Sequence, residues 1–158
     1  MLDLEAIELI KQLKARYFRS IDTCDIATLR DQVFTADASA HFRSPSYDIK
    51  IQGFAAMEEF YLKSFTPGKF GMHQGHHPEI EVSGDTATGI WYLHDIVIHL
   101  EHKTRLEGNG FYEDKYRKVN GEWKILHTGY FRTFDLMQPL GEVLEMHDGF
   151  ATGEFIPR

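Results

Sequence analysis

The chain has 158 residues, a formal charge of -7 and a hydrophobic fraction of 42%, which fits one globular domain with a single core. The acidic balance argues against a nucleic-acid partner, because binding to phosphates normally needs a basic face. The single cysteine, Cys24, excludes an internal disulfide and a cysteine-based zinc cluster. No apolar run is long enough to span a membrane, and the N-terminal residues mix acids with apolar residues, unlike a secretory signal. We therefore expect a cytoplasmic protein with no membrane partner.

The first predicted element is an amphipathic helix from Leu4 to Ile21. Its apolar residues recur at steps of three and four, which places them on one helical stripe. They are Leu4, Ile7, Ile10, Leu13, Tyr17 and Ile21. Asp25 is a suitable N-cap for a second helix that runs from Ile26 to Phe34. The segment from Gly53 to Phe65 predicts a third helix, which the following Thr-Pro-Gly ends.

After the third helix the pattern changes to that of β-strands. The segment from His76 to Glu101 holds two β-rich runs joined by Ser-Gly-Asp. A second pair of runs, from Gly110 to Val119 and from Trp123 to Phe134, is joined by Asn-Gly, a dipeptide typical of hairpin turns. Helices followed by long antiparallel strands predict an α+β fold, with the helices packed on one face of a curved sheet around a small-molecule pocket.

No repeat or low-complexity linker divides the chain, so we expect a single domain over residues 1–158. Its core should cover about residues 4–134. The tail from Gln138 to Arg158 is rich in glycine and proline. It is expected to be a docking or lid segment that is only partly regular.

Tyr17 and Asp22 are the first candidate site residues, at the end of the first predicted helix. Five residues turn an ideal helix by about 140°, so the two side chains converge only if the helix ends near Asp22. Asp25, as the cap of the next helix, favours such an ending. Each residue also has an ordinary structural interpretation, Asp22 as a capping carboxylate and Tyr17 as a core aromatic whose hydroxyl reaches the backbone.

Three histidines, His73, His76 and His77, lie around the start of the first long strand. Strand alternation would place His73 and His77 on one face and His76 on the other, so the three should not bind one metal ion, and they can equally be polar residues at a sheet edge. A single inward-facing histidine beside a carboxylate is the simplest general base near neutral pH, because the carboxylate fixes the tautomer and stabilises the imidazolium. His73 with Asp22 is such a pair if the fold brings them together.

Asp95 and Arg132, on later strands, complete the candidate residues. Asp95 shares its strand face with Trp91, Leu93 and Val97, so we expect a buried carboxylate there. Burial would then favour a cationic partner, for which Arg132 is the candidate, and a purely structural ion pair is as good an interpretation as a catalytic one. The remaining strand histidines are interpreted as solvated or packing residues: His94, His99, His102 and His127.

Several segments together resemble the SnoaL-like branch of the NTF2-like superfamily. They are YFRSID, FTADASAHF, GFAAMEEFY, PEIEVSGDTATGIWYL and GFYEDKYRKVNGEWKILHTGYFR. The similarity runs from about Leu4 to Phe134, and the order of the segments agrees with it, as do the GDTATG and NGEW turns. The resemblance implies a cone-shaped, cystatin-like fold in which N-terminal helices cover a curved antiparallel sheet. It does not imply one activity, because this superfold hosts dehydratases, isomerases, cyclases, epoxide hydrolases and binding domains.

The resemblance also implies roles for the candidate residues. In the dehydrochlorinase and dehydratase members, the carboxylate that closes the first helix, here Asp22, pairs with the histidine before the PEIEV strand, here His73, and the pair abstracts a proton during β-elimination. A bile-acid dehydratase adds a tyrosine five residues before that aspartate, which Tyr17 matches, and which would donate to a substrate oxygen. Its later aspartate and arginine map onto Asp95 and Arg132.

The leading hypothesis is a lyase of the dehydratase type that needs neither a metal nor another cofactor and acts on a small hydrophobic, cyclic or aromatic, hydroxylated substrate. One alternative is an isomerase or cyclase, since a base next to a carbonyl also forms dienolates. The other is a binding module that holds a ligand without turning it over. That module would keep His73 and Asp22 apart, or fill the pocket with side chains such as Phe18, Trp91 and Phe111.

Sheets of this family associate through their outer faces, usually as trimers in the dehydratase branch. A predicted apolar stripe lies on the strand face opposite Asp95 and consists of Ile90, Tyr92, Ile96 and Ile98. We therefore expect a homo-oligomer, with a trimer favoured over a dimer.

Overall fold

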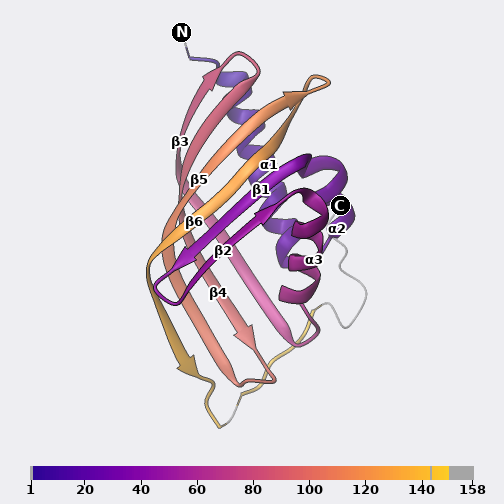
Figure 1. Cartoon of the computed structure of the whole chain (residues 1–158). Helices are drawn as coiled ribbons and strands as arrows, with labels where there is room; N and C mark the ends of the chain where they lie inside the picture. Colours follow the sequence, from indigo (N-terminus) through magenta and orange to yellow (C-terminus); the bar gives the residue numbers. More distant parts are fainter. Residues whose placement is uncertain (1, 143, 150–158) are drawn as a thin grey trace.

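The computed structural model describes residues 2–142 and 144–149. The helices are α1 (Leu4–Asp22), the short α2 (Ile26–Thr28), a π-helical turn η1 (Leu29–Val33) and α3 (Phe54–Ser64). The strands are β1 (Phe34–Ser44), β2 (Tyr47–Gln52), β3 (Lys69–Ser83), β4 (Thr86–His99), β5 (Thr104–Val119) and β6 (Glu122–Pro139). They form one six-stranded sheet in the order β2-β1-β6-β5-β4-β3. The sheet is curved and unclosed, with the helices on one of its faces (Figure 1).

The predicted α+β architecture is confirmed, and within the described residues no helix is long and apolar enough to cross a membrane. Helix α1 buries the predicted apolar stripe, including Ile10, Leu13 and Tyr17. Asp3 caps it by accepting the backbone N–H of Ala6 at 3.0 Å. The helix ends at Asp22, one residue after the predicted end at Ile21.

The second predicted helix is shorter than expected because it gives way to a strand. Asp25 does cap α2, by accepting the backbone N–H of Thr28 at 3.0 Å. After η1, however, Phe34 is already extended and opens β1. Strands β1 and β2 were not predicted, because short polar residues interrupt their alternation and local strand preference is weak. Their neighbours in the sheet supply the missing stabilisation.

The sheet is mixed, which corrects the expectation of a wholly antiparallel one. Strand β1 lies between β2 and β6 and runs parallel to β6. All other neighbouring strands are antiparallel. The parallel pair arises because β1 and β6 are far apart in the sequence, so no short turn constrains their direction.

Both predicted hairpins are present. Strands β3 and β4 are joined at Gly84, with φ 58°, and β5 and β6 are joined at Asn120 and Gly121, with φ 52° and 86°. Strand β6 continues to Pro139, so the predicted tail begins inside it. Residues 140–142 and 144–149 form no helix or strand, and residues 150–158 lie outside the described part of the chain.

Candidate active site

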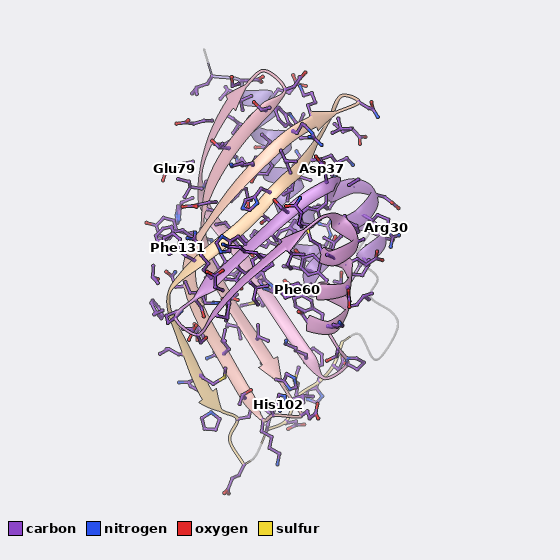
Figure 2. The ribbon with its side chains drawn as sticks, viewed as in Figure 1. Arg30, Asp37, Phe60, Glu79, His102 and Phe131 are labelled. Atoms are coloured by element: carbon purple, nitrogen blue, oxygen red, sulfur yellow. The ribbon has the colours of Figure 1, made fainter. Side chains whose placement is uncertain are left out.

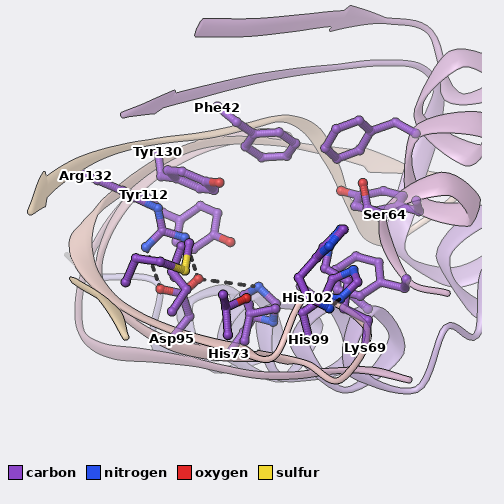
Figure 3. Close-up of a pocket in the computed structure, with 18 of the residues that line it drawn as sticks. Phe42, Ser64, Lys69, His73, Asp95, His99, His102, Tyr112, Tyr130 and Arg132 are labelled. Carbon is purple, nitrogen blue, oxygen red and sulfur yellow. Dashed lines mark hydrogen bonds and ion pairs between the residues drawn. The ribbon is translucent and has the colours of Figure 1, made fainter. Parts of the chain in front are cut away.

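A cavity of about 330 Å³ lies between the helices and the inner face of the sheet. Aromatic and aliphatic side chains of α1, α3 and the strands form most of its wall, with the polar groups gathered on two sides (Figure 3). A volume of this size is at the lower end of small-molecule pockets. The wall includes Tyr17, Ile21, Phe42, Phe60, Tyr61, Phe65, Val97, Leu106, Tyr112, Tyr130 and Met137.

The structure brings Asp22 and His73 into direct contact. His73 Nδ1 lies 2.5 Å from Asp22 Oδ1, and the backbone N–H of His73 donates to Oδ2 at 3.0 Å. An ionised carboxylate only accepts, so Nδ1 carries a proton and, in the neutral ring, Nε2 has the free lone pair. Gly71 leaves room for this contact, because a Cβ there would lie 3.1 Å from Asp22 Oδ1 and 3.2 Å from the His73 ring.

Asp22 lies behind His73 rather than on the main cavity wall. It borders a second cavity of about 350 Å³, together with Cys24, Phe65 and Asp148 of the tail. His73 itself lines the main cavity. In this arrangement the histidine can meet a ligand, while the carboxylate can act only through the histidine.

Asp95 and Arg132 form a buried bidentate ion pair, as one interpretation of the sequence proposed. Arg132 Nη1 and Nη2 donate to the two Asp95 oxygens at 2.6 Å each, and the residues are 1% and 8% exposed. Arg132 Nε donates to the Tyr47 hydroxyl at 2.9 Å. Because Gly108 has no side chain, the guanidinium fits beside it: a Cβ there would lie 1.8 Å from Arg132 Nη1. Burial lowers the pKa of Arg132, but the bonds and charge of Asp95 outweigh it, so the net pKa is raised.

The ion pair adjoins the histidine. Asp95 Oδ2 lies 3.9 Å from His73 Nε2, beyond hydrogen-bond range but close enough to stabilise a protonated ring (Figure 3). His73 therefore lies between two carboxylates, bonded to Asp22 through Nδ1 and facing Asp95 with Nε2.

Tyr17 lies on the same cavity but not in the histidine cluster. Its hydroxyl is 3.4 Å from that of Tyr61, and its ring meets Tyr112 edge-on at 6.2 Å. Burial raises the pKa of Tyr17, Tyr61 and Tyr112 well above the usual tyrosine value. Each of the three hydroxyls therefore keeps its proton and can serve as a donor across the physiological pH range.

A fully buried ion pair supports these tyrosines from behind. Lys14 Nζ lies 2.7 Å from Asp114 Oδ2, with both side chains 0% exposed, and 3.6 Å from the centre of the Tyr112 ring. Asp114 also accepts the hydroxyls of Thr128 at 2.8 Å and Tyr116 at 2.7 Å. Sequence reasoning missed this pair and Tyr112, although alternate positions of β5 are buried and could have indicated both Tyr112 and Asp114.

Strand alternation placed His77 wrongly. A register shift between His76 and Glu79, with His77 at φ 47°, breaks the alternation. The His77 ring therefore packs edge-on against Tyr92 at 6.0 Å, on the outer face of the sheet, while His73 faces inward. The expectation that His73, His76 and His77 would not share one ion agrees with this placement.

The fillers named for a binding module do not occupy the cavity. Phe18 and Trp91 are buried in the core, and Phe111 packs against Tyr92 and Phe131 on the outer face. Within the described part of the chain, none of the three lines the main cavity. The space in front of His73 is therefore open to a ligand.

A second polar group lines the cavity where β3 begins and β4 ends. It consists of Lys69, His99 and His102, which we call the basic end. His99, His102 and the exposed Glu101 hold ligand atoms within 4.8 Å of one another and are the one group among the described residues that could hold a metal ion. The sequence pattern carried no signal for Lys69, and it led His99 and His102 to be interpreted as solvated or packing residues.

Comparisons with known proteins agree with this architecture. A family model described as a SnoaL-like domain matches residues 2–129. A candidate aromatic ring hydroxylase of Novosphingobium aromaticivorans has a similar solved structure, with a TM-score of 0.78, 22% identity and coverage of 88% of this chain and 96% of that one.

Two further solved structures are similar. A hexachlorocyclohexane dehydrochlorinase (LinA, type 2) gives a TM-score of 0.73 at 18% identity, covering 92% of this chain and 96% of that one. A candidate scytalone dehydratase of Novosphingobium aromaticivorans gives a TM-score of 0.73 at 18% identity, covering 90% of this chain and 97% of that one. At these identities the likeness shows a shared fold and not a shared activity.

Proposed function

The chain belongs to the family of SnoaL-like domains, and on this premise we propose that it is a lyase of the dehydratase type. Its substrate would be a small hydrophobic ring compound with a hydroxyl β to an acidic C–H. One observation carries the proposal: His73 is held by Asp22 at 2.5 Å and faces an open, largely apolar cavity of about 330 Å³. The solved dehydrochlorinase and the candidate dehydratase share the fold, which is consistent with elimination chemistry.

In the proposed reaction, His73 is the general base. Its Nε2 takes the proton from the acidic carbon, and the electron pair of that C–H bond forms the new C=C bond as the C–O bond breaks. The hydroxyl leaves with the proton that the imidazolium returns, so the products are an alkene and water. A positioned base contributes about 10²- to 10⁴-fold in rate.

Asp22 and Asp95 would stabilise the cationic histidine. Asp22 is bonded to Nδ1, and the Asp95 carboxylate is 3.9 Å from Nε2. Arg132 holds Asp95 in place through two bonds. Asp22 is therefore proposed as a positioning residue, and the Asp95–Arg132 pair as the group that sets the charge beside the base.

Tyr17 is proposed to polarise the substrate oxygen that accepts electron density. Its raised pKa keeps the phenol protonated, and a donor in a dry pocket stabilises developing negative charge. Tyr61 and Tyr112 border the same region and can share this role. None of these proton transfers requires a metal ion or a redox cofactor, so the proposed reaction needs neither.

Two other functions use the same residues. An isomerase or cyclase would take the same proton and return it elsewhere on the substrate, with no loss of mass. A binding module would hold the ligand unchanged. The carboxylate-held His73 favours turnover over storage alone, because storage does not need an oriented base. Product analysis separates all three.

The test is a screen of hydroxylated ring compounds by mass spectrometry, with loss of one water as the signal. We expect His73→Ala to lose about 10²- to 10⁴-fold in kcat. His94→Ala is the matched control, because His94 pairs with Glu107 and does not line the cavity. Full activity in His73→Ala would contradict the lyase proposal. Products of unchanged mass would favour the isomerase, and binding without any product the binding module.

We also propose that the protein self-associates through the outer face of its sheet, as a trimer or else a dimer. Ile90 and Tyr92 of the predicted stripe are each 44% exposed, and Phe131 beside them is 37% exposed. Figure 2 shows Phe131 on the side of the sheet away from Phe60 and the helices. A cytoplasmic location, which rests on the composition, belongs to the same set of proposals.

A further inference from the structure

The basic end of the cavity is built by strand pairing. Lys69 opens β3 and His99 closes β4, and the two are direct cross-strand partners. His102 follows in the turn that leads to β5, and its ring stacks on that of His99 at 4.1 Å between centres. Figure 3 shows these three residues across the cavity from Arg132 and Asp95, with His73 between the two groups. A ligand in the cavity can therefore contact both groups at once.

The two ends of the cavity differ in charge. The charged groups around His73 are two carboxylates and one guanidinium. Asp22 is bonded to His73, and Asp95 is bonded to the guanidinium of Arg132. Arg132 uses three of its five N–H donors in bonds to Asp95 and Tyr47. An anionic group on a ligand would be repelled there, since the two carboxylates outnumber the one guanidinium.

The basic end presents a cation, Lys69, instead of carboxylates. Lys69 is half-buried, and no ion pair joins its ammonium to a carboxylate of residues 2–142. The ammonium lies 6.0 Å from the centre of the Phe65 ring. Burial lowers the pKa of Lys69, as expected for a cation without a counter-charge. Burial likewise lowers the pKa of His99, with His102 and Lys69 adding to the effect and Glu101 opposing it less. Lys69 supplies the formal positive charge on this part of the cavity wall.

The basic end offers donors rather than metal ligands. His99 Nδ1 accepts the backbone N–H of His102 at 3.2 Å, so a neutral His99 carries its proton on Nε2. That nitrogen can donate to an anion but has no lone pair for a cation. The ammonium of Lys69 next to it adds a second donor and repels metal ions.

We propose that the basic end binds a carboxylate on the substrate, so that the natural substrate is a hydrophobic ring acid. This inference rests on the proposed function, because it names the substrate class for the same cavity. One full positive charge with histidine donors beside it matches a monoanion. The carboxylate would hold one end of the ring compound at Lys69 and His99. Charge repulsion from Asp22 and Asp95 would disfavour the reversed orientation, in which the carboxylate lies beside His73.

The test compares naphthoate with naphthamide, two probes of nearly equal shape that have no leaving group, by calorimetric titration near neutral pH. We expect naphthoate to bind about tenfold more tightly, as for a hydrogen bond with a charged partner. In Lys69→Met and in His99→Gln this preference should shrink toward equality. Lys63→Met is the matched control, because it removes an exposed lysine on α3 that pairs with Glu59 and does not line the cavity.

Three results would overturn the inference. They are equal affinity for the two probes in the unmodified protein, a preference that survives both variants, and tight binding of Zn²⁺ that excludes naphthoate. Because the probes do not react, these outcomes are independent of the elimination chemistry. Acid binding that depends on Lys69 without any product from hydroxylated ring acids would leave this inference standing and contradict the lyase proposal.

Discussion

Asp22 accepts two N–H groups from His73, the ring Nδ1–H at 2.5 Å and the backbone N–H at 3.0 Å. One carboxylate at the end of α1 therefore fixes both the strand position and the ring orientation of the proposed base. Asp22 therefore links α1 to β3 at the candidate site.

Asp22→Asn should lower kcat by about 10²-fold, as expected for a general base that is no longer oriented. An asparagine has one accepting oxygen, so its amide group would face one of the two N–H donors. KM should change little, because Asp22 does not line the main cavity. Steady-state kinetics on the substrate found by the screen would measure both constants.

The control for that variant is Asp37→Asn, which alters an exposed carboxylate that pairs with Arg117. It should behave as the unmodified protein does. An Asp22→Asn variant with unchanged kcat would show that the carboxylate does not orient the proposed base.

Gly108→Ala should displace Arg132 and weaken its bonds to Asp95, since the new Cβ would lie 1.8 Å from Arg132 Nη1. We expect a loss of about 1–3 kcal/mol in the free energy of unfolding, measured in urea, together with a lower kcat. Gly141→Ala has nothing within 4 Å of its Cβ and is the control. Unchanged stability and activity in Gly108→Ala would mean that the guanidinium can move without consequence.

Lys14→Met should destabilise the fold by about 3–5 kcal/mol, because it leaves the Asp114 charge buried without its cation. The double variant Lys14→Met with Asp114→Asn should recover part of that loss, since neither position 14 nor position 114 then carries a buried charge. Chemical denaturation of both variants measures the difference. Equal stability of the two would attribute the loss to packing of Lys14 over the Tyr112 ring instead.

Stability should fall at alkaline pH. Burial raises the pKa of Tyr17, Tyr61, Tyr112 and Tyr116 well above the ordinary value in the folded protein, whereas the unfolded chain titrates normally. Above about pH 10 the folded state then holds more protons than the unfolded state. Each tyrosine therefore lowers the free energy of unfolding by up to about 1.4 kcal/mol per further pH unit. Tyrosinate absorbance should therefore appear for these residues only with unfolding, as circular dichroism followed in parallel would show. Their titration within a folded protein would contradict this prediction.

Tyr92→Lys should convert the proposed oligomer to a monomer, because it places a charge in the exposed aromatic cluster with Phe111 and Phe131. Light scattering at micromolar concentration gives the mass before and after the change. Leu9→Lys, on the exposed side of α1, is the control and should not alter the mass. A monomer for the unmodified protein would contradict self-association.

The sequence by itself determined the local elements and part of the site. The apolar stripe of α1, the capping Asp25 and the two hairpin turns are short-range features, set by periodicity and by backbone preference at single residues. For the same reason, the end of α1 at Asp22 was predictable. The pairing of Asp22 with His73 was proposed from the residue types and from a family pattern, and the structure places the two residues together.

Only the tertiary structure decided which distant residues meet. Lys14 and Asp114 form their pair across α1 and β5, and Arg132 reaches Asp95 across a sheet whose register shifts between Asn109 and Gly110. A shift of one residue turns a strand's side chains to the other face, and local sequence does not reveal where bulges fall, as His77 shows. The basic end depends likewise on the register that sets Lys69 opposite His99. Register and curvature are properties of the whole sheet, since they are fixed by the burial of all its strands together.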